Sequence, residues 1–198
     1  MNIKQRYTKK IINYIQPDQK VLDLGCGKGE LLDQLTKTKD VKSYGIEINF
    51  DNILECSKRG INVFQGNINE GLKEFSDNSF DVVILSQTLQ EVQDPLFVLN
   101  EMLRVGKVAI VTFPNFGYWK IRQQLLQGSA PVTKLLPYEW YNTPNIRLIT
   151  LKDFRVFCKK HKLNIIDDIP LYQTRLLNYL PLHKFSNLLS KEGLFILK

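Results

Sequence analysis

The chain has few of the residues that form metal centres or disulfide frameworks. It contains 198 residues, among them three cysteines and two histidines. The cysteines, Cys26, Cys56 and Cys158, are odd in number and far apart, which argues against paired disulfides and against the closely spaced ligands of a zinc site. We therefore expect no metal site, and we expect each cysteine to be a small buried apolar side chain.

Long apolar runs are also absent from the sequence. No stretch approaches the roughly 20 apolar residues that cross a bilayer, and the N-terminal stretch MNIKQRYTKK lacks the apolar centre of a secretory signal. The sequence therefore indicates a cytoplasmic protein with no membrane partner. With 43% apolar and 24% charged residues, a chain of this length is expected to form one domain, residues 1–198.

The net charge of +7 is not concentrated in any one stretch. Basic residues occur at most as adjacent pairs, such as Lys9-Lys10 and Lys159-Lys160, so solvated helix faces explain them best. We therefore expect no nucleic-acid partner. An anionic substrate or an acidic partner surface stays open as an alternative.

Short apolar runs alternate with helical repeats between residues 20 and 113. Before them, Ile3, Tyr7, Ile11 and Ile15 recur at helical spacing and predict an amphipathic helix. Strands are expected at residues 21–24, 43–48, 61–65, 80–85 and 108–113, then at 163–169 and, as a last edge strand, 194–197. Helix caps are expected at Asn49 or Asp51, at Asp94 and at Thr150. This alternation predicts a parallel sheet with helices on both faces and a ligand at the carboxyl ends of its strands.

Residues 114–149 break this alternation, and we call them the insert. The segment is rich in aromatics and proline, and one helix is expected in it, over residues 119–126. Aromatics with arginine are typical of protein-binding surfaces, and aromatics also form lids over substrates. A partner surface and a substrate roof are therefore both open, and a small core of the insert's own is compatible with either.

A glycine loop follows the first expected strand, in VLDLGCGKGE, residues 21–30. A triphosphate loop would need Ser or Thr after the lysine, but Lys28 is followed by Gly29. A dinucleotide loop would need a third small residue where Glu30 stands, and a carboxylate there adds negative charge beside a pyrophosphate. Both phosphate ligands are therefore disfavoured.

The acids around the loop favour a cationic ligand. The glycines are spaced G-x-G-x-G, at Gly25, Gly27 and Gly29, and Asp23 precedes them. Asp23 suits an ammonium group, and Glu47, at the end of the second strand, can accept both hydroxyls of a ribose. Together they favour an adenosyl ligand with an amino-acid tail, such as S-adenosylmethionine (SAM). The alternative is a purely structural turn in which Asp23 caps the next helix, and this has less support.

Three segments resemble class I SAM-dependent methyltransferases: VLDLGCGKGELL, YGIEI and NSFDVVILSQTLQEVQDP. The resemblance implies an α/β Rossmann-like fold with a seven-stranded, mostly parallel sheet whose last strand is antiparallel. It also implies that SAM, or its demethylated product S-adenosylhomocysteine (SAH), contacts Asp23, Gly25, Cys26, Gly27, Gly29, Glu47, Ile48, Asn67, Ile68, Ser86 and Gln87. The family usually has Asp at position 67, where the side chain meets the adenine amino group, and an amide oxygen can accept the same bond.

A closer resemblance is carried by ILSQTLQEVQDP, LRVGKVAIVTFPNFGYWKIRQQLLQG and PVTKLLPYEWYNTPNIRLITLKDF. These segments resemble the MetW family of methionine biosynthesis, over roughly residues 18 to 170. Arg147 stands where that family commonly has His, which disfavours any role that needs an imidazole there. The resemblance implies an accessory or regulatory partner of homoserine O-acyltransferase. Because SAM is made from methionine, its binding could report the state of the pathway.

No residue can be assigned as a catalytic base. Both histidines lie late in the chain, and the residues that follow the fourth strand, such as Ser86 and Gln87, are neutral. Methyl transfer to oxygen or nitrogen often needs a base. We therefore favour a SAM-binding regulatory partner with little or no methyltransferase activity. The alternative is an active small-molecule methyltransferase with the insert as its lid.

Overall fold

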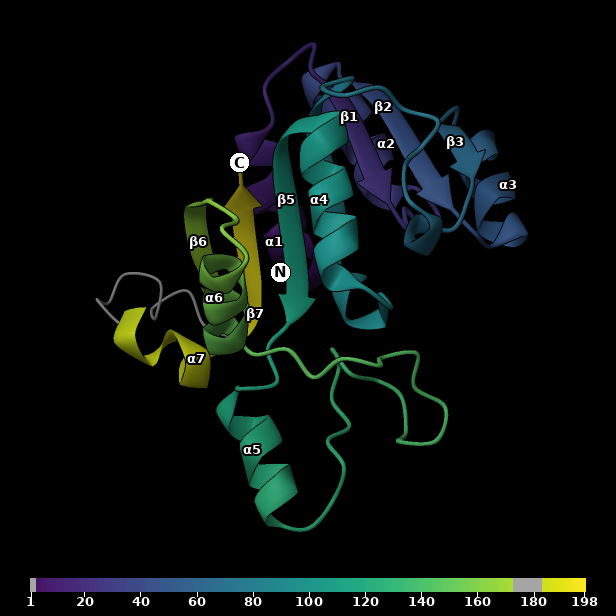
Figure 1. The fold of residues 1–198 in the computed structure, drawn as a ribbon. Helices are drawn as coiled ribbons and strands as arrows, with labels where there is room; N and C mark the ends of the chain where they lie inside the picture. Colours follow the sequence, from purple (N-terminus) through teal and green to yellow (C-terminus); the bar gives the residue numbers. More distant parts are fainter. Residues whose placement is uncertain (1–2, 173–182) are drawn as a thin grey trace.

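Seven strands form one sheet in the order β3-β2-β1-β4-β5-β7-β6 (Figure 1). The computed structural model describes residues 3–172 and 183–198. The strands are β1 (Lys20–Leu24), β2 (Lys42–Glu47), β3 (Asn62–Gln65), β4 (Phe80–Ser86), β5 (Gly106–Pro114), β6 (Ile165–Tyr172) and β7 (Ser190–Leu197). The helices are α1 (Ile3–Tyr14), α2 (Glu30–Lys39), α3 (Phe50–Lys58), α4 (Pro95–Val105), α5 (Trp119–Leu126), α6 (Leu151–Lys160) and α7 (Ser186–Leu189), with short 3-10 turns η1 (Ile68–Glu70), η2 (Leu89–Glu91) and η4 (His183–Phe185).

The sheet is parallel from β3 to β5 and antiparallel at β7. β7 runs against β5 on one side and against β6 on the other. The expected α/β Rossmann-like methyltransferase fold is thus confirmed, including its antiparallel last strand. None of the helices within the described ranges is long and apolar enough to cross a membrane.

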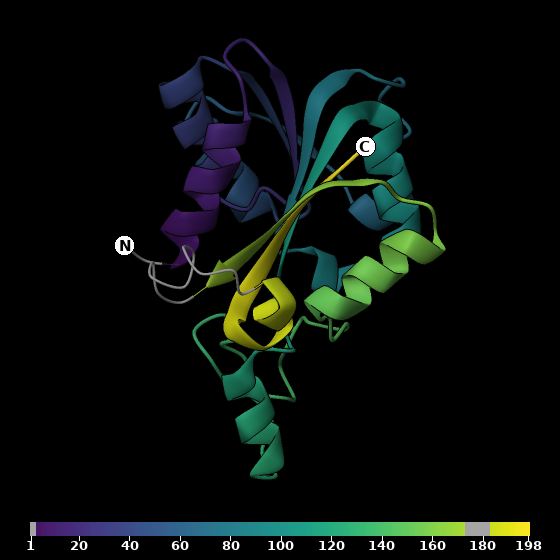
Figure 2. The same cartoon turned by 90° about the vertical axis from the view of Figure 1, so that its left-hand side faces the viewer.

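Both faces of the sheet are covered by helices, as Figure 2 shows edge-on. In β4, Val82 and Ile84 point into one apolar cluster, which includes Ile11 of α1 and Leu32 of α2. The alternate residues of that strand point into a second cluster, with side chains of α4 and α6. Because successive side chains of a strand point to opposite faces, the uninterrupted apolar run in β4 follows from burial on both sides.

Side-chain caps fix where three helices begin. Asn49 accepts a hydrogen bond from the Asn52 backbone N–H, which decides between the two expected caps of α3. Asp94 caps α4 with Pro95 in the first turn, and Thr150 caps α6. Each cap satisfies a backbone donor that the helix itself leaves free.

The last strand was expected at an edge of the sheet, and this prediction is wrong. β7 lies between β5 and β6, and β6 is the edge strand. The physical reason is visible in the residues: the end of β7 is apolar throughout and fully buried, as an interior strand must be. β6 contains Pro170 and two exposed residues, Ile166 and Asp167, and proline is tolerated at a sheet edge.

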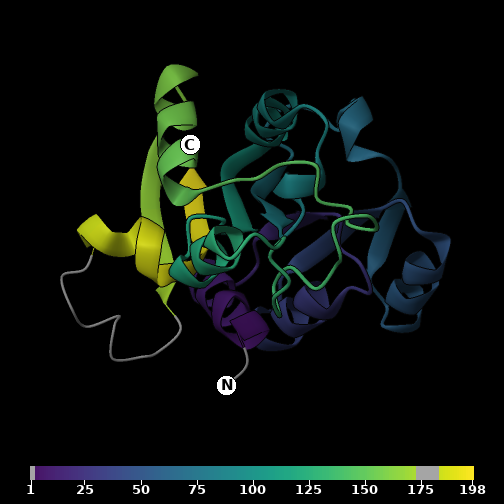
Figure 3. The ribbon, with the colours of Figure 1, turned by 90° about the horizontal axis from the view of Figure 1, so that it is seen from below.

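The topology places a crevice where β1 and β4 end. The two strands are neighbours, yet β1 leads to α2 on one face and β4 leads to α4 on the other. Such a switch point opens a ligand site at the carboxyl edge of the sheet. The insert lies beyond the same edge, below the parallel strands in Figure 1 and across them when seen from below in Figure 3.

One buried amide fastens both ends of the insert. The Asn115 side chain donates to the backbone carbonyls of Asn187 (3.0 Å) and Ser190 (2.8 Å), and its oxygen accepts from Gly117 N (2.9 Å) and Leu151 N (3.2 Å). It is fully buried. The start of the insert, the start of α6 and the start of β7 are thus held at one point.

Replacing Asn115 by Ala should lower the free energy of unfolding by about 2–4 kcal/mol, because buried backbone groups would lose their partners. Urea denaturation measures the change. Asn142→Ala, at an exposed position of the insert, is the control and should change the stability by less than about 0.5 kcal/mol. Equal stabilities for the two variants would contradict the role assigned to Asn115.

Candidate functional site

The glycine loop is tied to the end of the neighbouring strand. Gly25 N and Cys26 N both donate to the Ile46 carbonyl, at 2.8 and 3.1 Å. Gly25, Gly27 and Gly29 all have positive φ angles, between 55° and 73°, a region that L side chains rarely adopt. The chain therefore turns sharply out of β1 and into α2.

Two of the glycines serve different purposes. A Cβ atom at Gly29 would lie 2.6 Å from Ile61 Cδ1 and 2.9 Å from Cys56 Sγ, so this position allows the loop to pack against α3 and the strand after it. A Cβ atom at Gly27 would meet nothing within 4 Å. Gly27 thus borders open space, in which a ligand can approach the backbone, whereas Gly29 does not.

Glu47 holds the loop from the end of β2. Its carboxylate accepts hydrogen bonds from Gly27 N (2.8 Å), Ile48 N (2.9 Å) and Asn49 N (2.8 Å), and the side chain is buried. Backbone N–H groups around a carboxylate stabilise its charge. Glu47 therefore orders the loop in addition to any bond that it makes to a ligand.

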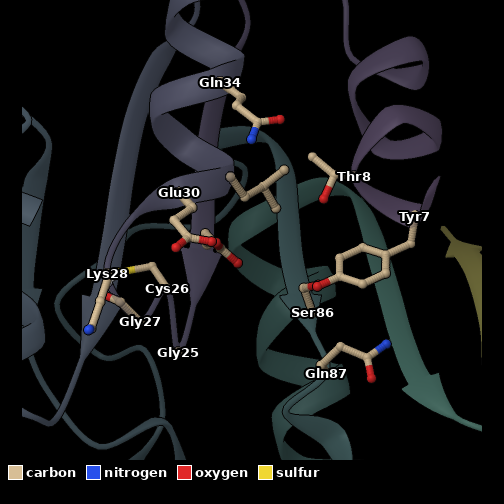
Figure 4. A pocket seen from close by; sticks show the side chains of 12 residues that line it. Tyr7, Thr8, Gly25, Cys26, Gly27, Lys28, Glu30, Gln34, Ser86 and Gln87 are labelled. Carbon is tan, nitrogen blue, oxygen red and sulfur yellow. Dashed lines mark hydrogen bonds between the residues drawn. The ribbon is translucent and has the colours of Figure 1, made fainter. Parts of the chain in front are cut away.

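A cavity of about 530 Å³ opens between the loop, α1 and the end of β4 (Figure 4). Tyr7 and Thr8 reach it from α1, and Ser86 and Gln87 close it from below. Its remaining lining comes from the loop and the first turns of α2: Asp23, Gly25, Cys26, Gly27, Lys28, Glu30, Leu31 and Gln34. A small molecule with polar groups fits a space of this size.

Asp23 is a buried acid in the lining of the cavity. Burial, and then the negative charge of Glu47, raise the pKa of Asp23 to about 8. Its Oδ1 atom is buried without a hydrogen-bond partner among the described residues. A buried carboxyl group with an unused oxygen favours a ligand that brings a positive charge or a donor.

Tyr7 borders both Asp23 and a second buried acid, Glu192 of β7. Its hydroxyl hydrogen-bonds with Ser86, while burial, then Glu192 and then Asp23 raise its pKa to about 12. Burial also raises the pKa of Glu192 to about 8, and neither oxygen of that carboxyl group has a partner among the described residues. The phenol is therefore neutral at physiological pH and can donate or accept hydrogen bonds.

The expected adenine side lies in a separate, smaller cavity of about 230 Å³, which Asn67 and Ile68 help to line. The Asn67 oxygen already accepts two bonds, from Asn69 N and Asn69 Nδ2, both at 3.1 Å. An adenine amino group would have to replace one of them. Ile48, 63% exposed at the end of β2, leaves an apolar surface for a flat ring.

The structure thus divides the eleven residues that were predicted to contact SAM or SAH. Six line the larger cavity: Asp23, Gly25, Cys26, Gly27, Ser86 and Gln87. Asn67 and Ile68 line the smaller cavity, and Gly29, Glu47 and Ile48 line neither. Cys26, expected to be a buried apolar side chain, is half-buried at the larger cavity.

Sequence reasoning missed Tyr7 and Thr8 as lining residues. Tyr7 was assigned to the apolar stripe of the N-terminal helix, and it does belong to that core. The sequence shows a polar residue, Thr8, next to Tyr7. Polar residues usually lie on the exposed side of a helix, and only the structure shows that Thr8 is buried.

The family model described as "Methionine biosynthesis protein MetW" matches residues 5–197, nearly the whole chain. The chain belongs to the MetW family.

Among curated relatives of this MetW member is a Rhodopirellula baltica protein, named bifunctional methionine biosynthesis protein MetXA/MetW. The two are 38% identical over 170 residues, which cover 81% of this chain and 27% of that protein. A Bdellovibrio bacteriovorus ubiquinone/menaquinone biosynthesis C-methyltransferase UbiE is 29% identical over 133 residues, 59% of this chain and 57% of its own length. The MetW chain therefore spans about a quarter to just over half of these relatives.

Solved structures share the fold at low sequence identity. A SAM-dependent methyltransferase from Archaeoglobus fulgidus superposes with a TM-score of 0.72 at 19% identity, covering 99% of this chain and 93% of the other. A second, from Mesorhizobium loti, has a TM-score of 0.70 at 13% identity, covering 99% of both chains. The MetW chain thus has the fold of SAM-dependent methyltransferases.

Asp23 and Glu192, the two buried acids with raised pKa values, predict how the stability of this MetW protein depends on pH. Their carboxyl groups keep their protons up to about pH 8 in the folded chain but lose them near pH 4 when unfolded. The unfolded chain binds fewer protons between these values, so the free energy of unfolding falls as the pH rises, by about 1.4 kcal/mol per pH unit for each group. Asp23→Asn should remove one such contribution.

Urea denaturation between pH 5 and 7 measures this slope. Glu192→Gln is the matched variant and should remove the other contribution. A slope in Asp23→Asn equal to that of the unmodified chain would show that Asp23 is ionised in the folded, ligand-free protein.

Proposed function

We propose that this MetW-family protein binds SAM or SAH at the carboxyl edge of its sheet, in the cytoplasm, and acts as an accessory and regulatory partner of homoserine O-acyltransferase. The observation that carries the ligand assignment is the buried Asp23 carboxyl group, whose unpaired oxygen lies beside a loop with open space at Gly27. An ammonium group of an amino-acid tail would supply the missing partner.

The remaining contacts follow the division of the site. Asp23, Gly25, Cys26, Gly27, Ser86 and Gln87 would hold the methionine end, and Glu47 and Ile48 would meet the ribose and one face of the adenine. Asn67 and Ile68 would border the far side of the ring. Gly29 would act indirectly, because it packs the loop against α3.

The fused relative supports the partner. The MetW-like region spans 27% of the bifunctional MetXA/MetW protein of Rhodopirellula baltica, so most of that polypeptide is another unit. Two activities joined in one chain act at high effective concentration. In this chain, the partner would be a separate homoserine O-acyltransferase.

A second candidate function is methyl transfer to a small molecule. The fold supports it, and SAM would supply a methyl group on a sulfonium. The cavity offers Tyr7 and Glu30 beside Asp23, but the pKa of Tyr7 is raised to about 12, which makes the phenol a poor base near pH 7. Tyr7 therefore does not serve as the base, and this second candidate would need Glu30 for that role.

Gly27→Ala should weaken SAM binding by about tenfold or more, about 1.4 kcal/mol, because its Cβ would fill space at the cavity wall. Gly60→Ala is the matched control, since Gly60 also has a positive φ and open surroundings but lies outside both cavities. Calorimetry should show unchanged SAM affinity in the control. Equal affinities for both variants would place the ligand elsewhere.

The partner role is tested by an acyl-transfer assay with purified homoserine O-acyltransferase from the same organism. We expect the rate to change when this protein is added, and to change again with SAM, while radiolabelled methyl groups stay on SAM. If the rate of acyl transfer is the same with and without the protein while the labelled methyl group moves to an acceptor, the methyltransferase alternative is correct.

A further inference from the structure

Exposed apolar side chains are concentrated in the insert. Eighteen large apolar residues are exposed among the described residues, and nine of them lie between positions 114 and 149. They are Trp119, Leu125, Leu126, Val132, Tyr138, Trp140, Tyr141, Ile146 and Leu148. Trp140 is 76% and Tyr141 70% exposed, and none of the nine lines the cavity beside the glycine loop. A substrate roof would cover that cavity, so the exposed side chains fit a protein-binding surface better.

The insert is an ordered scaffold for these side chains. Tyr118, Ile121 and Leu136 form a small core of its own, with Phe116 packed against it. Asn115 fastens its start, and the Gln90 carbonyl accepts bonds from Ile146 N (2.9 Å) and Arg147 N (3.0 Å) near its end. The exposed aromatics are therefore presented by a segment held at both ends, which lowers the entropy lost on docking.

The charge of the insert indicates the chemistry of its partner. It carries Lys120, Lys134 and two arginines, against the single acid Glu139, a net charge of +3. Two copies of this chain would repel each other at such a surface, whereas a partner with acidic residues around an apolar patch would be attracted.

We propose that the exposed aromatic half of the insert is the surface on which the acyltransferase docks. This rests on the proposed function, and the fused MetXA/MetW relative is the reason for choosing this occupant. Trp140 and Tyr141, whose rings meet edge to face at 5.7 Å, anchor in an apolar pocket of the acyltransferase. Lysines of the insert face acidic side chains at the rim.

The test compares binding of purified acyltransferase to three forms of the full chain, by surface plasmon resonance. Trp140→Ala with Tyr141→Ala should weaken binding by about 30-fold or more, because central aromatics dominate such interfaces. The control is Val156→Ala with Phe185→Ala, two residues that are each 58% exposed outside the insert, and it should bind as the unmodified chain does. Thermal melting and SAM calorimetry should be the same for all three.

The possible outcomes distinguish the docking surface from the partner role and from self-association. If the unmodified chain binds and the insert variant binds equally well, the docking surface is elsewhere, although the partner role stands. If the unmodified chain does not bind the acyltransferase at all, the partner role and the docking surface both fail. If sedimentation shows that the unmodified chain dimerises and the insert variant does not, the surface joins copies of this chain and the proposal is overturned.

Discussion

The site depends on one carboxylate that accepts hydrogen bonds from three backbone N–H groups. Glu47 joins Gly27 in the loop after β1 to the first residues after β2. Without it, Gly27 N would lose the side-chain acceptor that the neighbouring strand provides, and the turn that leaves Gly27 facing open space would be less fixed. The acid thus organises the protein's own backbone first, and any ribose would meet an oxygen whose orientation is already set.

The protein is basic, yet acids outnumber the one basic residue, Lys28, in the lining of its cavity. The chain carries a net charge of +7, while Asp23 and Glu30 line the cavity and Glu192 lies behind Tyr7. Burial raises the pKa of both Asp23 and Glu192 to about 8, and the charge of Glu47 adds to the shift of Asp23, so both carboxyl groups keep their protons near pH 7. A ligand with an ammonium group beside Asp23 would lower the pKa of that carboxyl group and pair with the carboxylate it forms.

Much of the fold could be predicted from the sequence because its signals are local. The alternating apolar runs, the caps at Asp94 and Thr150 and the glycine loop each depend on a few neighbouring residues. The place of β7 could not be predicted in this way, because it depends on which distant strands pair. The oxygen of Asn67 is used by Asn69, and Gly29 packs against Cys56; both facts arise from contacts that spacing does not reveal.

Gln90 connects the cavity to the insert. Its side-chain amide donates to the carbonyl of Gln87 (2.6 Å), a cavity residue held at a left-handed φ of 58°, and its own carbonyl accepts from Ile146 and Arg147. Gln90 is thus hydrogen-bonded both to a cavity residue and to the far end of the insert. If a small molecule bound at Gln87 changes the affinity of the insert for a partner protein through Gln90, then that partner changes the affinity for the small molecule by the same factor.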